Sequence, residues 1–432
     1  MAAAAASARR GLTPAEAAAL AARSRYRVLG SLMVVLGLVG LWLFAFNVPA
    51  GAVSRFGLNQ GGATTAIQLP ELVLPTLPTI VVLMVISLGL GGYQLWRSFG
   101  RWSTAVLGLA ILCFILAFLT WATADKSINL AGMLKNSLLR AVPLTLGALS
   151  GILSERAGVI NIAIEGMMLA AALTGCVVAS AAGNLWYGLL AAILTGALLA
   201  LVHGVLSIRY KIDQVISGVV INIFSVGITS FLSAKFLQET FTNLNNSGTF
   251  PTVPIPLLSR LPFLGGILFE SNFFTYAMYV FLIVVHVALF YTRWGLRTRA
   301  VGEHPKAADT LGINVARTRY VAVLLSGAMA GLAGAYFTLG SVGRFDEVMT
   351  AGRGFISLAA VIFGNWNPVG AFGASLIFGF ADALQGRLAI LRVPIPSQFL
   401  LMAPYVATMI ALAGLVGRAQ PPAADGQPYE KG

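Results

Sequence analysis

The sequence of 432 residues has very little charge. Only 10% of its residues are Asp, Glu, Lys or Arg, whereas soluble chains are about a quarter charged. So few charges cannot cover the surface of a folded chain of this length in water. Hydrophobic residues reach 58%, and the mean hydropathy is +0.84. The composition therefore argues against a soluble protein, a disordered chain or a nucleic-acid-binding domain, and it indicates an integral membrane protein.

Residues that usually carry chemistry are also scarce. The two cysteines, Cys113 and Cys176, lie inside apolar runs, where packed thiols are expected rather than a disulfide. The three histidines are far apart and lack metal-ligand spacing. No Gly-Lys dipeptide occurs, which excludes a P-loop. The sequence thus predicts no catalytic residues, no metal site and no cofactor bound by this chain.

Apolar runs recur along the chain, and a helical span needs about 20 such residues. They predict an all-α polytopic membrane protein with about 10–12 transmembrane or re-entrant helices. Most of the 28 Lys and Arg residues fall inside if both termini are cytoplasmic, so N-in/C-in is predicted. Full-length candidates lie at 28–46, 79–96, 104–123, 157–181, 186–208, 213–235, 274–291, 320–340 and 397–416, and shorter ones at 138–153, 354–366 and 369–385.

These runs divide the chain into regions. Residues 1–27 form an Ala/Arg-rich tail, predicted to be cytoplasmic, with a transit peptide as the alternative. A tail rich in proline and glycine at 418–432 is predicted to be cytoplasmic and disordered. Between the tails we expect an N-terminal transmembrane extension at 28–129 and a transmembrane domain at 130–417, which includes an external loop at 236–273 and a cytoplasmic loop at 292–319.

Polar residues within apolar segments are expensive and serve by default as functional candidates. Glu165 is the strongest of these candidates, and Asn161 lies four residues earlier, on the same face of a predicted helix. Asn222 is in the middle of another segment, and Asp382 is a further candidate. For each, the alternative is an interhelical hydrogen bond that holds the bundle together.

Two stretches suggest irregular backbone or internal symmetry. Asn365, Trp366 and Asn367 precede Pro368 between two short apolar runs, as expected of a re-entrant hairpin that lines a cavity. Residues 158–163 resemble residues 354–359, which include Ser357, and the predicted topology runs the two stretches in opposite directions. This pattern would make an inverted repeat, with a pathway at the repeat interface; chance similarity is the alternative.

The loop at 292–319 contains a short capped helix. Glu303 followed by Pro305 favours a helix start, and Gly312 can end the helix in the left-handed conformation. Small residues at Ala307 and Ala308 allow close approach of another surface. A short surface helix between two spans has no core of its own to join, so we interpret it as a docking element.

Residues 300–313 resemble the coupling-helix segment of ABC-importer permeases, in the group that imports branched-chain amino acids, simple sugars and nucleosides. Three further stretches are similar to that group, at 153–168, 213–218 and 352–368. The resemblance covers roughly 130–416 and is strongest to the nucleoside branch. The first 130 residues, with two extra spans at 79–123, depart from the family pattern.

The resemblance implies a permease subunit of an ATP-driven importer that moves a small neutral solute, in the first place nucleosides, by alternating access. A simple-sugar importer is the alternative within the family. An ion-coupled secondary transporter using Glu165 and Asp382, and a membrane-embedded enzyme, are alternatives outside it. The substrate pathway would include Asn161, Glu165, Asn222, Ser357, Asn365, Trp366 and Asn367, and the ATPase-coupling residues would be Glu303, Pro305, Lys306, Ala307, Ala308, Asp309, Gly312 and Ile313.

The partners follow from the same resemblance. Separate ATPase subunits would bind and hydrolyse ATP with Mg²⁺ and dock on the coupling loop. A second permease subunit, either a paralogue or another copy of this chain, would complete the pore. A solute-binding protein or lipoprotein outside would deliver the solute. The chain itself would be a multi-pass protein of the bacterial cytoplasmic (inner) membrane, surrounded by lipid.

Overall fold

The computed structural model describes residues 14–49, 51–60, 68–238, 242–391, 402 and 420–431. Within these residues, ten helices are long and apolar enough to cross a membrane, which confirms an all-α polytopic membrane protein. The chain divides into two compact units. The first comprises residues 1–60, 68–130 and 387–395, and the second comprises residues 61–67, 131–386 and 396–432.

The first unit contains three packed membrane helices: α2 (Pro14–Gly40), α3 (Thr76–Trp96) and α4 (Ser103–Ala122). Helix α2 continues through a π-helical turn at Leu41–Ala45, so part of the predicted tail at 1–27 and the first predicted span form one continuous helix. Glycines allow α2 and α3 to approach closely, because a Cβ at Gly91 would lie 2.7 Å from Val34. Small residues commonly serve this purpose between membrane helices.

A small sheet that the sequence did not predict joins the ends of these helices. Strand β1 (Val53–Gly57) pairs antiparallel with β2 (Leu72–Pro75) and parallel with β3 (Ser127–Asn129). Arg55 lies opposite Val73 on one side and opposite Ser127 on the other. Strands of three to five residues are too short to produce a clear alternation of hydrophobic and polar residues.

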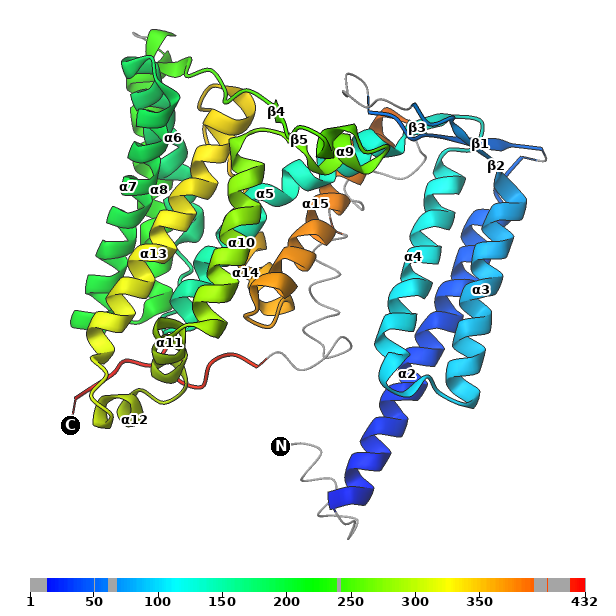
Figure 1. The fold of residues 1–432 in the computed structure, drawn as a ribbon, viewed down its shortest axis with the longest axis horizontal. Coiled ribbons are helices and arrows are strands. Elements are labelled where there is room, and N and C mark those ends of the chain that lie inside the picture. Colours follow the sequence, from blue (N-terminus) through cyan, green and yellow to red (C-terminus); the bar gives the residue numbers. More distant parts are fainter. Residues whose placement is uncertain are drawn as a thin grey trace. The chain divides into compact units, whose positions relative to one another are not determined.

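The second unit is built around buried helices. Helix α5 (Leu130–Glu155) is the most enclosed of the candidate spans, and α6 (Ile164–Ala182), α7 (Leu185–Gly204) and α13 (Val315–Ala335) pack closely together (Figure 1). The other helices are α8 (Gln214–Leu232), α9 (Leu264–Leu268), α10 (Phe273–Tyr291), α11 (Arg293–Glu303), α12 (Pro305–Thr310), α14 (Arg353–Phe363) and α15 (Pro368–Ile390).

Glycines bring α7 and α13 into backbone contact. A Cβ at Gly196 would lie 2.2 Å from the carbonyl oxygen of Gly327 and 2.7 Å from the nitrogen of Gly331. Without a hydrophobic driving force between helices in lipid, such close packing is a main source of their association. The glycines of these two helices therefore fix the centre of the second unit.

Several predicted spans differ from the observed helices. The short run at 138–153 belongs to the 26-residue α5, and the run at 369–385 belongs to the full-length α15. The predicted span at 157–181 begins only at Ile164, because residues 156–163 are not helical. The run at 397–416 lies outside the described residues, apart from residue 402.

The loop predicted at 236–273 has structure of its own. It contains α9 and a short antiparallel pair, β4 (Val253–Pro254) with β5 (Glu270–Ser271). The Lys135 ammonium of α5 donates hydrogen bonds to the carbonyl of Gly266 (3.0 Å) and the hydroxyl of Ser271 (2.7 Å). This buried lysine ties the loop to the central helix.

Candidate substrate pathway and coupling surface

The carboxylate of Glu165 lies at the N-terminus of α14. Its Oε1 accepts hydrogen bonds from the Thr350 hydroxyl (2.6 Å) and the Gly352 N–H (2.8 Å), and its Oε2 accepts one from the Gly354 N–H (2.6 Å). The first N–H groups of a helix lack intrahelical partners, and the helix dipole favours an anion there. Glu165 is also in the first turn of α6. The N-termini of two helices thus meet at one buried acid.

This junction needs a glycine at position 354. A Cβ on Gly354 would lie 2.5 Å from the Cα of Glu165, so α14 could not approach α6 with any larger residue. Helix α14 has only 11 residues, about 16 Å in length, and it is too short to cross a membrane. Short, interrupted helices whose N-termini point at one site are typical of transporter binding regions.

Asn161 does not share a helical face with Glu165, which corrects the sequence expectation. Because α6 begins at Ile164, Asn161 lies in the non-helical stretch before it. The Asn161 amide donates to the Ser326 hydroxyl of α13 at 2.9 Å, whereas Glu165 faces α14. The two residues are close in sequence but serve different neighbours.

The other polar residues near the break satisfy its free backbone groups. The amide of Asn222 accepts from the Gly166 N–H (2.7 Å) and donates to the Ile162 carbonyl (2.9 Å). His203 bonds to the Ile160 carbonyl at 2.9 Å. Non-helical backbone at membrane depth needs such partners. The contacts of Asn222 are the interhelical hydrogen bonds that were considered as the alternative for this residue.

Ser357 lies in the contact between α14 and α5. Its hydroxyl donates to the Arg353 carbonyl at 2.8 Å, and a Cβ on Gly147 would lie 2.5 Å from its oxygen. Residues 354–359 are helical, whereas the similar stretch 158–163 is not. The six-residue similarity therefore does not mark structurally equivalent segments.

Asn365, Trp366 and Asn367 form the tight turn between α14 and α15. The first two have positive φ angles of 53° and 52°. The Trp366 indole donates to the Glu155 carboxylate, and the Arg156 guanidinium donates to the Trp366 carbonyl at 3.0 Å. The turn is thus attached to the end of α5, and α14 separates it from Glu165 by about 16 Å.

Asp382, a candidate from the sequence, belongs to a charged cluster on α5, α14 and α15, and the sequence did not predict its pairing with two arginines. Asp382 forms ion pairs with Arg140 (2.5 Å) and Arg353 (3.6 Å). Arg140 lies about 22 Å along the helix axis from the C-terminal end of α5 and ten residues from its N-terminal end, within a helix long enough to cross a membrane. These side chains are 28–40% exposed. Ionisable groups at membrane depth usually face a bundle interior or a water-filled cavity, so the cluster is a further pathway candidate.

The coupling loop contains two helices rather than one. Helix α11 precedes α12, which has Pro305 at its first position as predicted. The chain leaves α12 through Gly312, whose φ is +81°. Glycine adopts this left-handed conformation at little cost, and the predicted helix start and end are both confirmed.

The two alanines of α12 differ in their exposure. Ala308 is 2% exposed and packs with Val301 and Val315, whereas Ala307 is exposed. The surface that α12 presents to a partner therefore excludes Ala308. The exposed residues at α12 and its two ends are Glu303, His304, Lys306, Ala307, Thr310, Leu311 and Gly312, while Pro305, Asp309 and Ile313 are half-buried.

The C-terminal tail runs along this end of the second unit (Figure 1). The Ala424 N–H donates to the Gly302 carbonyl at 2.9 Å, and the Ala423 N–H donates to the Glu303 carboxylate at 3.2 Å. Tyr429 packs against the apolar cluster of α11, α12 and α13. Disorder was predicted for 418–432 from composition, but residues 420–431 make specific contacts, because other segments complete their hydrogen bonds.

Two charges on the bundle hold the tail in place. The Arg319 guanidinium donates to the Gln427 carbonyl (2.9 Å), and Lys211 forms an ion pair with Glu430 (2.6 Å). Burial raises the pKa of Asp425 to about 7, while a hydrogen bond from the Gly426 N–H and the positive charge of Arg319 oppose this increase. The docked tail therefore carries a carboxyl group that titrates near neutral pH.

A family model described as "Branched-chain amino acid transport system / permease component" matches residues 133–416, well over half of the chain. The chain belongs to this permease family. It is a multi-pass protein of the bacterial cytoplasmic membrane, with the family region beginning inside α5. No solved structure matches the permease.

Three curated relatives are similar over much of their length. The guanosine ABC transporter permease NupQ of Bacillus subtilis is 42% identical over 68% of this chain and 95% of its own. The nucleoside ABC transporter permease NupC of Lactococcus lactis is 40% identical over 68% of this chain and 96% of its own. The putative glucose ABC transporter permease TsgC13 of Haloferax volcanii is 40% identical over 60% of this chain and 78% of its own. All three are named as permeases, not enzymes.

Proposed function

We propose that this permease is the membrane subunit of an ATP-driven importer of nucleosides. The observation that carries this proposal is the identity of 40–42% over nearly the full length of two permeases named for guanosine and nucleosides. The glucose permease is similar over a smaller share of its length, so a simple sugar is the second candidate solute. Separate ATPase subunits bind ATP and Mg²⁺, and a second permease subunit and an external binding protein complete the transporter.

The pathway in this proposal passes the junction of α6 and α14. ATP binding moves the coupling loop, and α14 transmits the movement, because one of its ends is held by Glu165 and the other by the turn at 365–367. This movement would switch the permease between two conformations, and the bound nucleotide would determine which of them is more populated. In the adjacent cluster, the single negative charge of Asp382 neutralises only one of the two positive charges of Arg140 and Arg353. An ion-coupled mechanism is disfavoured because Glu165 and Asp382 both already have several partners.

Uptake by the complete transporter tests the solute. The permease, its ATPase subunits and its binding protein would be reconstituted in proteoliposomes with ATP inside the compartment that the ATPases face. We expect ATP-dependent uptake of guanosine at least tenfold faster than uptake of glucose or leucine. Faster uptake of glucose would assign the sugar function instead, and uptake driven by an ion gradient without ATP would contradict the importer class.

Paired substitutions on α12 test the coupling role. Ala307→Arg places a charge on the exposed face, so it should reduce solute-stimulated ATPase activity at least tenfold and leave the melting temperature unchanged. Ala308→Arg forces a charge into the cluster with Val301 and Val315, so it should lower the melting temperature. Normal ATPase stimulation and co-purification of the ATPase with Ala307→Arg would remove this face from the docking surface.

A further inference from the structure

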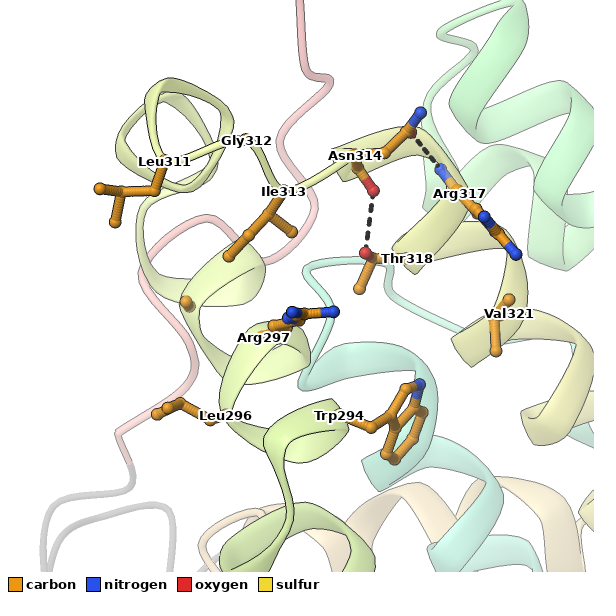
Figure 2. Close-up of a pocket in the computed structure, with 11 residues that line it drawn as sticks. Trp294, Leu296, Arg297, Leu311, Gly312, Ile313, Asn314, Arg317, Thr318 and Val321 are labelled. Carbon is orange, nitrogen blue, oxygen red and sulfur yellow. Dashed lines mark hydrogen bonds between the residues drawn. The ribbon is translucent and has the colours of Figure 1, made fainter.

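A hollow of about 940 Å³ lies beside the coupling loop, between α11 and the first turns of α13 (Figure 2). Trp294, Leu296 and Arg297 line it from α11, and Arg317 and Val321 line it from α13. Figure 2 shows Arg297 pointing from α11 toward α13, with Trp294 and Val321 at the end nearer the spans. The hollow thus combines two guanidinium groups with an apolar wall.

The position of the hollow matches the edge of a membrane. Trp294 follows the end of the span Phe273–Tyr291, and Val321 lies within the span Val315–Val342. Tryptophan is enriched where membrane spans meet the headgroup region. Leu296 is 62% exposed and Val321 is 37% exposed, so the wall can cover an acyl chain that continues into the lipid.

Two other cations at this end of the bundle have partners within the protein. Arg319 donates to the carbonyls of Ala157 and Gln427, and Lys211 pairs with Glu430. Among the described residues, no ion pair or side-chain hydrogen bond involves the guanidinium of Arg297 or Arg317. A pocket that offers two positive charges without an internal counter-charge is complementary to an anion.

From this charge complementarity we propose that the hollow binds an anionic phospholipid of the cytoplasmic leaflet. Its phosphate lies between Arg297 and Arg317, and one acyl chain lies along Leu296 and Val321. Guanidinium groups suit phosphate geometry, and basic pockets between membrane helices on the cytoplasmic side bind such headgroups. The lipid bridges α11 and α13, the two helices that hold α12, and this site does not depend on which solute is transported.

Retention of lipid by the purified full-length permease tests the proposal. The protein would be exchanged into micelles that contain phosphatidylglycerol, phosphatidylcholine or inorganic phosphate, and bound molecules would be counted by native mass spectrometry. We expect one tightly bound phosphatidylglycerol and weak binding of phosphatidylcholine. One arginine near an anionic surface contributes about fivefold in affinity, so Arg297→Gln with Arg317→Gln should weaken phosphatidylglycerol binding about 25-fold.

Two controls make the result specific. Arg293→Gln with Arg209→Gln removes two exposed charges outside the hollow and should leave binding unchanged, and Arg297→Lys with Arg317→Lys should retain most of it. Equal binding of both lipids, inorganic phosphate binding as tightly as phosphatidylglycerol, or unchanged binding by the double glutamine variant would overturn the proposal. The proposal would also be overturned if the double glutamine variant bound lipid normally but no longer co-purified with the ATPase, because the hollow would then be a protein-docking surface.

Discussion

The two units of the molecule use membrane helices in different ways. In the most apolar stretch of α3, 28% of the residues are buried, whereas the corresponding share of α5 is 89%. Helices α3 and α4 contain no Asp, Glu, Lys or Arg, but α5 contains Lys135 and Arg140 and α6 contains Glu165. The ionisable residues of α5 and α6 thus lie where protein surrounds the helix and supplies hydrogen-bond partners.

The family match follows the same division. It begins at residue 133, so the three helices of the first unit precede it. Alignment with NupQ covers 95% of that relative but 68% of this chain. The polar, tightly packed unit is therefore the one shared with known permeases, and the comparison predicts that substitutions of equal chemistry have unequal effects in the two units.

The largest expected difference concerns buried and exposed acids. Glu165→Ala removes the acceptor for three hydrogen bonds, and each bond to a charged group contributes about 1.5–3 kcal/mol. We expect a loss of at least about 3 kcal/mol in the free energy of unfolding, together with loss of transport. The measurements are denaturant unfolding in detergent and solute uptake.

The exposed Glu71 of the first unit provides the control for this variant. Glu71→Ala should leave the unfolding free energy within about 0.5 kcal/mol. A Glu165→Ala protein that unfolds and transports like the Glu71→Ala protein would show that the junction at α14 contributes nothing.

A smaller difference is expected from glycines. A Cβ at Gly196 meets the α13 backbone, whereas nothing lies within 4 Å of a Cβ at Gly89 in α3. Gly196→Ala should cost about 1–3 kcal/mol because it overpacks the contact, while Gly89→Ala should be neutral or stabilise by up to about 1 kcal/mol because alanine favours helix. Thermal unfolding checks both, and equal shifts would show that α7 and α13 adjust freely.

The tail of the second unit should respond to pH through Asp425. Because its pKa is raised to about 7 when docked, compared with about 4 for a free carboxyl, docking weakens through Asp425 as pH rises from about 4 toward 7. Above pH 7, Asp425 causes no further change in docking. Spin labels on cysteines at Leu311 and Lys431, with Cys113 and Cys176 replaced, would report the tail's distance from α12.

We expect these labels to show a larger docked fraction at pH 5 than at pH 8. Asp425→Asn should make the fraction independent of pH over this range. A wild-type tail with the same distance distribution at both pH values would contradict the titration of Asp425 during docking.

The smallest effect is expected from removal of the three N-terminal membrane helices, α2, α3 and α4, of the first unit. Deletion of residues 2–129 should change ATP-dependent uptake less than twofold, because the family region begins at residue 133. The control is a full-length protein purified in the same way, with equal amounts of folded protein verified by gel filtration. Loss of uptake by a folded truncated protein would make the first unit part of the transport machinery.

Local patterns predicted the parts of the site that depend on neighbouring residues in the chain. Pro305 and Gly312 delimit α12 because their backbone preferences act within one or two residues. The partners of Glu165 could not be predicted in this way, since Thr350 and Gly354 lie nearly 200 residues away. The pairing of Arg140 with Asp382 across a similar distance was missed for the same reason.

The sequence by itself determined that this chain is a polytopic helical membrane protein with a short helix delimited by Pro305 and Gly312, because hydropathy and capping are local properties. Tertiary structure decided where helices break and which way side chains face. It placed Asn161 outside α6, turned Ala308 into the protein, and bound the tail to Gly302 and Glu303. These outcomes depend on hydrogen bonds and packing between distant segments, which no periodicity in a single segment encodes.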